Sequence, residues 1–272
     1  MVHPCFGRRT DVGATTAFLD WSNVVEAYID RWIPCNRGFF EAVVLALPDM
    51  PDYGPLLVPG AGPGCELPLL LERFPGRRIV ASDPSAEMVQ AINRQVETSG
   101  TAEIVTEVKP LEELEPSFGA AAVSFFTVHT LRNPVEAILS QARAVRHGGW
   151  SAVVYFPPIP EPGGPLDALY RAARVVRPKD PPDWELRLCD AVREAGMVPL
   201  TMETLRQTWR FDTPDDFREL MELLPHIRKI REKVGEESYE AMWKAWSNEP
   251  GLVEDEDDWV GEAAARFVLI AC

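Results

Sequence analysis

Short apolar runs alternate with segments of helical spacing between residues 56 and 156. The runs are LLVP, RIVASD, AEIVTEV, AAAVSFFTV and WSAVVYF, and they predict short buried strands. Segments such as PSAEMVQAINRQVETSG and NPVEAILSQARAVRHGG predict helices that close at glycine. Strands that alternate with helices favour a parallel sheet with helices on both faces. We therefore expect an α/β fold.

The flanking segments predict further helices and two more strands. Residues 15–47 have helical spacing, and Pro34 is expected to end or kink the helix, so that residues 36–47 form a second one. PPIPEPGGP predicts a loop because a central strand does not tolerate so much proline. WELRLCDAVREAGM then predicts a helix and PLTMETLRQTWRF a sixth strand. Residues 214–247 predict two or three helices, VEDEDDW an acidic loop and AAARFVLIAC a last strand.

The expected architecture is a Rossmann-like, doubly wound, mostly parallel seven-stranded sheet. N-terminal helices precede this sheet, and a helical insertion stands before its last strand. The predicted division is an N-terminal helical lid at 1–50, a Rossmann-like core at 51–212, a helical insertion or lid at 213–258, and the last strand of the core at 259–272.

Charge and cysteine usage exclude several classes of protein. The formal net charge is −15, which disfavours nucleic acid because a polyphosphate partner favours clustered Lys and Arg. No apolar run is long enough to cross a bilayer, and the start, MVHPCFGRRT, lacks the apolar core of a secretory signal. The 5 cysteines are scattered without a CxxC or Cys/His cluster, so we expect free thiols, no metal site and a cytoplasmic protein.

The stretch VPGAGPG places Gly60, Gly62 and Gly64 directly after the first predicted strand. Glycine there lets the backbone turn tightly and approach a ligand at the carboxyl edge of the sheet. The spacing is GxGxG, whereas a dinucleotide loop has GxGxxG, and no GK[ST] follows as in a phosphate-binding P-loop. Asp83 ends the second predicted strand, where its carboxylate can accept both ribose hydroxyls of an adenosine. The alternatives are a glycine-rich turn without a ligand and an Asp83 that caps the next helix.

Three stretches together resemble the class I S-adenosylmethionine-dependent methyltransferases, and most of all their small-molecule branch. They are VPGAGPG, IVASDPSAEMV and VSFFTVHTLRNPVEAILSQARAVRHGGWSAVV. The resemblance covers about residues 56–156 and extends more loosely to residue 272. It implies S-adenosylmethionine as cofactor and methyl transfer to a small-molecule acceptor, with secondary metabolism as the expected setting.

The resemblance also implies a role for individual residues. The glycine loop packs against the methionine part and ribose, Asp83 binds the ribose hydroxyls, and an aromatic lid residue covers the methionine end. The residues implied to contact the cofactor are Gly60, Ala61, Gly62, Gly64, Asp83, Pro84, Met88, Leu111, Ser124, Phe125 and Tyr28. The sequence departs from the family at Val58 and Lys109, where the family often has an acid.

Methyl transfer from a sulfonium is an in-line displacement, so the protein mainly aligns the reactants and excludes water. No catalytic triad or metal cluster is therefore expected. His129 follows the fourth predicted strand and suits a general base near neutral pH, or else it caps a helix or packs. Tyr155 ends the fifth predicted strand and is a second candidate to reach the acceptor.

Two other functions compete with methyl transfer. One is an S-adenosylmethionine-binding protein without transfer, either pericyclase-like or a partner subunit, which the departures at Val58 and Lys109 favour. The other is an NAD-dependent oxidoreductase, which the GxGxG spacing and the helices before the last strand disfavour. The sequence leaves the acceptor atom and the oligomeric state open.

Overall fold

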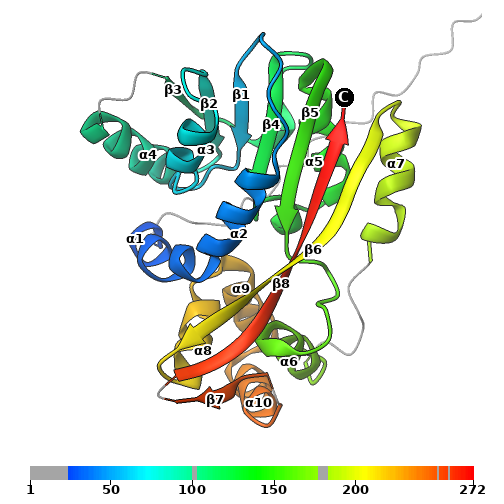
Figure 1. Cartoon of the computed structure of the whole chain (residues 1–272). Coiled ribbons are helices and arrows are strands. Elements are labelled where there is room, and N and C mark those ends of the chain that lie inside the picture. The colour runs from blue at the N-terminus through cyan, green and yellow to red at the C-terminus, as the bar shows by residue number, and fades with distance from the viewer. Residues whose placement is uncertain (1–23, 100–102, 177–182, 250, 257) are drawn as a thin grey trace, which may run out of the picture.

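A mixed sheet forms the centre of the computed structural model, which describes residues 24–99, 103–176, 183–249, 251–256 and 258–272. The sheet has eight strands in the order β3-β2-β1-β4-β5-β8-β6, and β7 pairs with β8 (Figure 1). The strands are β1 (Leu56–Pro59), β2 (Ile79–Asp83), β3 (Ile104–Val108), β4 (Gly119–Phe125), β5 (Val145–Tyr155), β6 (Val198–Phe211), β7 (Val253–Asp255) and β8 (Asp258–Ala271).

Strands β1 to β5 run parallel, β8 is antiparallel to β5, and β6 is antiparallel to β8. The Rossmann-like, mostly parallel sheet is thus confirmed. One local expectation is wrong, because the segment predicted as an acidic loop forms β7 and the start of β8. The acidic side chains of β7 are exposed, and such side chains are tolerated in a strand at the edge of a sheet.

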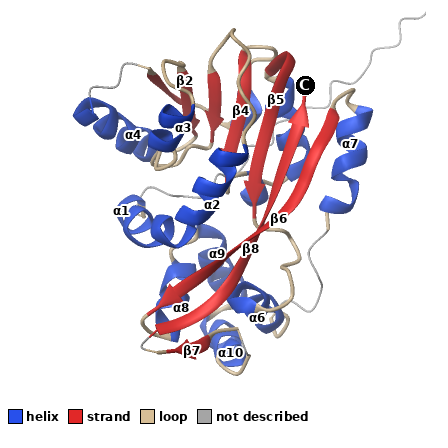
Figure 2. Ribbon diagram, in the orientation of Figure 1, coloured by secondary structure: helices blue, strands red, loops and turns tan. Residues whose placement is uncertain are grey.

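Helices cover both faces of the sheet, as a doubly wound fold requires (Figure 2). Side chains of α2 (Ile33–Ala46), α3 (Leu67–Arg73) and α4 (Ala86–Ser99) join the hydrophobic cluster on one face. Side chains of α5 (Pro134–Arg143) and α7 (Leu188–Glu194) join the cluster on the other.

The helical stretch before β1 is continuous, which corrects the expectation of a break at Pro34. A short α1 (Val25–Ala27) leads into a π-helical turn (Tyr28–Trp32), and α2 follows directly. Pro34 lies in the first turn of α2, where a missing backbone N–H costs little. The π-helical turn before it has a wider hydrogen-bond spacing, so the helix continues past the proline. Residues 15–23 of the predicted first helix lie outside the described residues.

Two other helix boundaries differ from the prediction. Helix α5 ends at Arg143, and the chain enters β5 at Val145, before the glycine pair predicted to close the helix. Helix α6 (Gly164–Ala173) begins within the segment predicted as a loop, because Pro165 occupies its first turn, where proline is tolerated.

The hairpin of β6 and β8 extends beyond the parallel strands and carries the insertion (Figure 1). Both strands are 14 residues long, and their pairing runs from Val198 with Ala271 to Phe211 with Trp259. The insertion contains α8 (Pro214–Glu222), α9 (Pro225–Val234) and α10 (Glu236–Trp246), and α10 packs on α6. The domain limits expected from the sequence stay a prediction.

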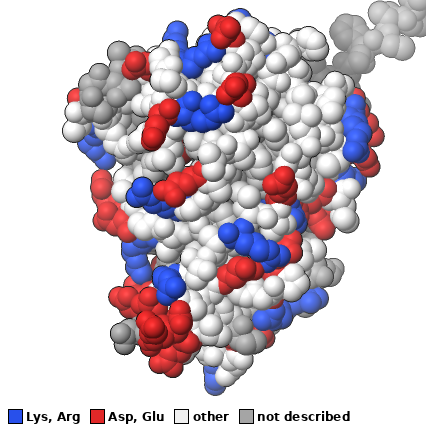
Figure 3. All heavy atoms as spheres, in the orientation of Figure 1, with Lys and Arg blue, Asp and Glu red and all other residues white. Residues whose placement is uncertain are grey.

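Charge is unevenly spread over the face drawn in Figure 3. Asp and Glu gather at the end of the molecule where α8, β7 and the tips of β6 and β8 lie, while Lys and Arg are dispersed among acidic neighbours. No helix among the described residues is long and apolar enough to span a bilayer.

Candidate active site

The glycine loop joins β1 to α3, and the surroundings of its three glycines differ. All three have positive φ, at 66° for Gly60, 52° for Gly62 and 81° for Gly64. A Cβ on Gly60 would lie 2.3 Å from the Thr127 side chain, and one on Gly64 would lie 2.8 Å from Leu67, so these two positions make room for the protein itself. A Cβ on Gly62 would meet nothing within 4 Å. Of the three glycines, Gly62 alone faces open space.

Neighbouring elements hold this loop in place through hydrogen bonds to its backbone. The Ala61 N–H donates to the Ser82 carbonyl at 3.0 Å. The Thr127 hydroxyl donates to the Gly60 carbonyl at 3.0 Å, and the Gln95 amide donates to the Pro63 carbonyl at 2.8 Å. Strand β2, the segment that follows β4, and helix α4 therefore fix the loop from three sides.

Asp83 ends β2 and lies against the loop with its side chain 7% exposed. One carboxylate oxygen accepts from the Gly62 N–H and the other from the Ser85 N–H, both at 2.9 Å. Burial raises the pKa of Asp83 to about 6, against the opposing effect of the two N–H donors. Asp83 thus supports the start of α4 and faces the open side of the loop. Each oxygen can accept a further hydrogen bond. Asp83 can therefore both cap α4 and bind the ribose hydroxyls of a ligand in this geometry.

Glu66 is a buried carboxyl beside the loop that the sequence did not single out. Its side chain is 4% exposed, and its carboxyl group makes no hydrogen bond or ion pair with another of the described residues. Burial and the charge of Asp83 raise the pKa of Glu66 to about 8, and its own backbone N–H lowers it. The available signal was a lone acid in the apolar stretch CELPLLL.

Tyr28 connects the N-terminal helices to the loop. Burial, together with the nearby Glu66, Cys65 and Asp83, raises the pKa of the Tyr28 phenol. The structure therefore brings this predicted lid residue close to the glycine loop.

The residues predicted to contact adenine lie on separate elements. Pro84 is partly exposed, and Met88, 3% exposed on α4, packs with Val25 and Ala91. Leu111 lies in a 3-10 turn, is 2% exposed and packs with the side chains of α5 in another cluster. Met88 and Leu111 belong to different hydrophobic clusters, and an adenine held between them stays a prediction.

The end of β4 carries Ser124 and Phe125 and then a strained residue. Ser124 is 1% exposed as a whole residue, and the backbone contact that the resemblance implies stays a prediction. Phe125 packs against Phe40 at 5.2 Å between ring centroids. Phe126 has φ at 53°, a region that non-glycine residues rarely adopt, and its ring stacks on Phe156 at 4.6 Å.

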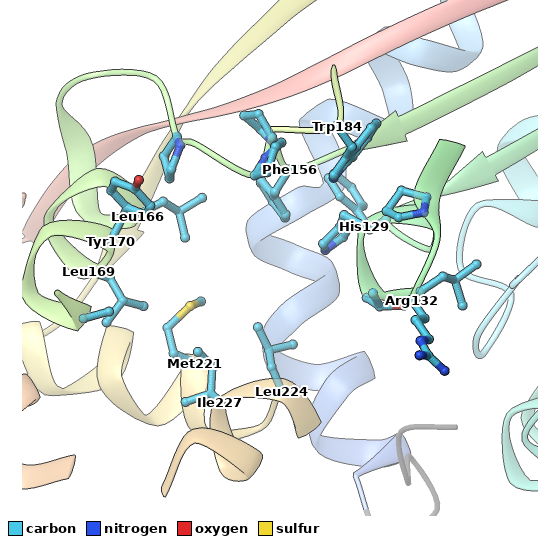
Figure 4. Close-up of a pocket in the computed structure, with 18 of the residues that line it drawn as sticks. His129, Arg132, Phe156, Leu166, Leu169, Tyr170, Trp184, Met221, Leu224 and Ile227 are labelled. Carbon is cyan, nitrogen blue, oxygen red and sulfur yellow. The ribbon is translucent and has the colours of Figure 1, made fainter. Parts of the chain in front are cut away.

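A pocket of about 610 Å³ opens beyond the ends of β4 and β5. Figure 4 shows α6 on one wall, the segment after β4 on the opposite wall and the insertion below. The lining is mainly apolar and aromatic, and it includes Tyr28, Trp32, Phe126, His129, Arg132, Phe156, Leu166, Leu169, Tyr170, Arg174, Trp184, Met221, Leu224 and Ile227.

Comparison with known proteins identifies the core. A family model described as a methyltransferase domain matches residues 57–153, which contain the glycine loop and Asp83. Residues 57–153 form a class I S-adenosylmethionine-dependent methyltransferase domain. No curated protein is detectably similar to the chain in sequence.

Solved structures share the fold of this chain. The YcgJ protein of Bacillus subtilis has a TM-score of 0.59 at 10% identity, over 86% of this chain and 97% of that one. A geranyl diphosphate methyltransferase bound to S-adenosylmethionine has a TM-score of 0.51 at 14% identity, and the match covers 96% of this chain and 92% of that one. Phosphoethanolamine N-methyltransferase 2 of Haemonchus contortus has a TM-score of 0.54 at 16% identity, and the match covers 93% of this chain and 60% of that one. At such identities the likeness concerns the fold.

S-adenosylmethionine fits the residues at the loop of the methyltransferase. The open side of Gly62 admits a ligand, and the two Asp83 oxygens keep acceptor capacity for ribose hydroxyls. When bound, this cofactor supplies a methyl group already activated by the sulfonium.

The two candidate catalytic residues of the methyltransferase have different surroundings. His129 lies in the 3-10 turn after β4, lines the pocket, and contacts Phe156 edge to face at 5.7 Å between centroids. Tyr155 does not line the pocket: it is fully buried on the opposite face of the sheet, and its hydroxyl donates to Glu185 at 2.8 Å. Because side chains alternate along β5, Phe156 occupies the position expected of Tyr155.

The other residues that line the pocket were not predicted from the sequence. Trp32 lines the pocket, while Trp209, Trp243 and Trp246 are core residues, and no local pattern in the sequence distinguishes them. Phe156 and Trp184 also line the pocket, and neither belongs to a recognisable sequence motif.

Proposed function

We propose that this methyltransferase transfers a methyl group to a small-molecule acceptor bound in the 610 Å³ pocket. The observation that carries the proposal is the position of Tyr28, which lies close to Asp83 and Glu66 at the cofactor loop and also lines the pocket. One side chain borders both spaces, so a methyl group at the loop and an acceptor in the pocket can meet.

The chain supplies alignment and exclusion of water. The pocket volume lies within the range of small-molecule sites, and its aromatic walls desolvate what they enclose. Holding acceptor and donor in a near-attack pose can supply roughly 7–11 kcal/mol of the barrier. His129, which lines the pocket next to Phe156, accepts the proton that an acceptor hydroxyl or ammonium loses.

Two further features support the proposed setting. The geranyl diphosphate and phosphoethanolamine enzymes of the same fold act on small molecules, which supports a comparable acceptor in secondary metabolism. The described cysteines Cys35, Cys65, Cys189 and Cys272 are free thiols, which supports a cytoplasmic location.

Two measurements test the proposal. Calorimetry with S-adenosylhomocysteine and with NAD is expected to show binding of the first alone. Transfer of label from methyl-labelled cofactor to members of a metabolite library is then expected, and His129→Ala should slow turnover more than it weakens cofactor binding. Binding of NAD instead of S-adenosylhomocysteine would contradict the family chemistry.

Cofactor binding without transfer to any acceptor would favour the competing function. In that case the chain is an S-adenosylmethionine-binding protein that steers a rearrangement or assists a partner. The observation in its favour is Val58, fully buried in β1, at a position where the family often has an acid.

A further inference from the structure

The pocket has a charge opposite to that of the whole chain. The chain has 42 acidic and 27 basic residues, yet no Asp or Glu is found among the described residues that line the pocket. Two arginines, Arg132 and Arg174, do line it. Among the described residues, this acidic chain therefore lines the pocket with guanidinium groups and with no carboxylate.

Arg132 is available to a ligand. It makes no ion pair or hydrogen bond with any described side chain, whereas nearby arginines are paired: Arg31 with Glu219 at 2.9 Å and Arg171 with Glu249 at 2.8 Å. A guanidinium presents planar donors that match an anionic group.

The backbone of Arg132 is fixed on both sides. The preceding 3-10 turn is closed by the Leu131 N–H, which donates to the Val128 carbonyl at 3.2 Å. The following Asn133 is the N-cap of α5. Arg132 and His129 therefore come from one short ordered segment on the same wall (Figure 4).

We propose that the acceptor is an apolar, ring-containing anion, an inference that rests on the proposed methyl transfer. Its apolar body packs between the rings of Phe156 and Trp184 and the aliphatic side chains of α6 and the insertion. Its negative group pairs with Arg132, and its nucleophilic group lies toward His129. A cationic acceptor would leave water for a cavity whose described lining has arginines and no carboxylate, which costs free energy.

The test uses three probes of one shape and different charge: biphenyl-4-carboxylate, biphenyl-4-carboxamide and 4-(aminomethyl)biphenyl. Binding is followed by quenching of tryptophan fluorescence, with S-adenosylhomocysteine present and absent, because Trp32 and Trp184 line the pocket. The carboxylate is expected to bind at least about fivefold more tightly than the amide, the scale of a partly exposed ion pair, and the amine most weakly. This preference should shrink as salt is added.

Two arginine variants locate the effect. Arg132→Gln should bind the carboxylate and the amide equally. Arg78→Gln removes the same charge from an exposed residue at the amino end of β2, away from the pocket, and should keep the preference. Near-ultraviolet circular dichroism verifies that both variants are folded.

Three outcomes overturn the inference: equal affinity of the wild type for acid and amide, a preference that survives Arg132→Gln, or failure of all three probes to bind. Each can occur while S-adenosylhomocysteine still binds, and then methyl transfer stands and only the acceptor class is wrong. Loss of S-adenosylhomocysteine binding would instead contradict the proposed function, whatever the probes do.

Discussion

The carboxyl group of Glu66 lies among the other titratable groups of the cofactor loop without a cationic partner among the described residues. Its pKa of about 8 and that of Asp83 at about 6 arise chiefly from burial. A carboxyl that is neutral in the fold and ionised in the unfolded chain makes stability depend on pH.

Between pH 6 and 8, the folded protein holds a proton on Glu66 that the unfolded chain has already released. The free energy of unfolding should therefore fall as pH rises through this window, by at most about 1.4 kcal/mol per pH unit from this one group. Glu66→Gln removes that contribution and should flatten the profile. Urea denaturation at pH 6, 7 and 8 without cofactor measures it. The control is Glu72→Gln, at an exposed residue of α3, the helix that begins directly after Glu66. Equal slopes in wild type and Glu66→Gln would refute the assignment.

Gly62 offers a second test, because its missing side chain faces open space. Gly62→Ala should lose about 1–2 kcal/mol of stability from the positive φ and should also weaken S-adenosylhomocysteine binding. Gly196→Ala is the matched control: its φ is +80° and a Cβ there also meets nothing within 4 Å, but it lies after α7. Calorimetry should show unchanged affinity for the control. Equal affinities in both variants would mean that the Gly62 loop is only a turn.

Helix α8 shows how a single element depends on its first residues. The Thr213 hydroxyl accepts from the Asp216 N–H at 3.3 Å, and the Asp216 carboxylate accepts from the Thr213 N–H at 2.8 Å. This reciprocal capping box begins the helix that brings Met221 to the pocket floor.

Removal of this cap should destabilise the protein. Thr213→Ala is expected to lower the free energy of unfolding by about 1 kcal/mol, whereas Thr213→Ser keeps the hydroxyl and most of the stability. Urea titration of the two variants measures the difference. If both variants lose the same amount, the hydroxyl does not stabilise the helix.

The molecule as a whole is joined by β6 and β8, which run from the parallel sheet into the insertion. Phe217 lies fully buried where α8 meets this hairpin, and its ring stacks on Trp246 at 4.9 Å. Because the same two strands belong to both regions, we expect the sheet and the insertion to unfold together.

Phe217→Ala opens a cavity at this junction and should cost about 3–5 kcal/mol. Circular dichroism and tryptophan fluorescence should report one coincident unfolding transition in the variant, shifted to lower denaturant than in the wild type. If the fluorescence transition shifted to lower denaturant while the circular dichroism transition did not, the insertion would unfold as a separate unit.

Local pattern was enough to predict the parallel strands, the loop at Gly60 to Gly64 and the acid at Asp83, because apolar periodicity, glycine and a strand-terminal carboxylate act within a few neighbouring residues. The π turn before Pro34 and the start of α6 were missed, since proline signals a break but is also tolerated in a first helical turn. The facing of Tyr155 and Phe156 depends on strand register, and the burial of Glu66 depends on what packs over it. The pocket is made by segments far apart in the chain, from Tyr28 to Ile227, and no local pattern encodes which of their side chains meet.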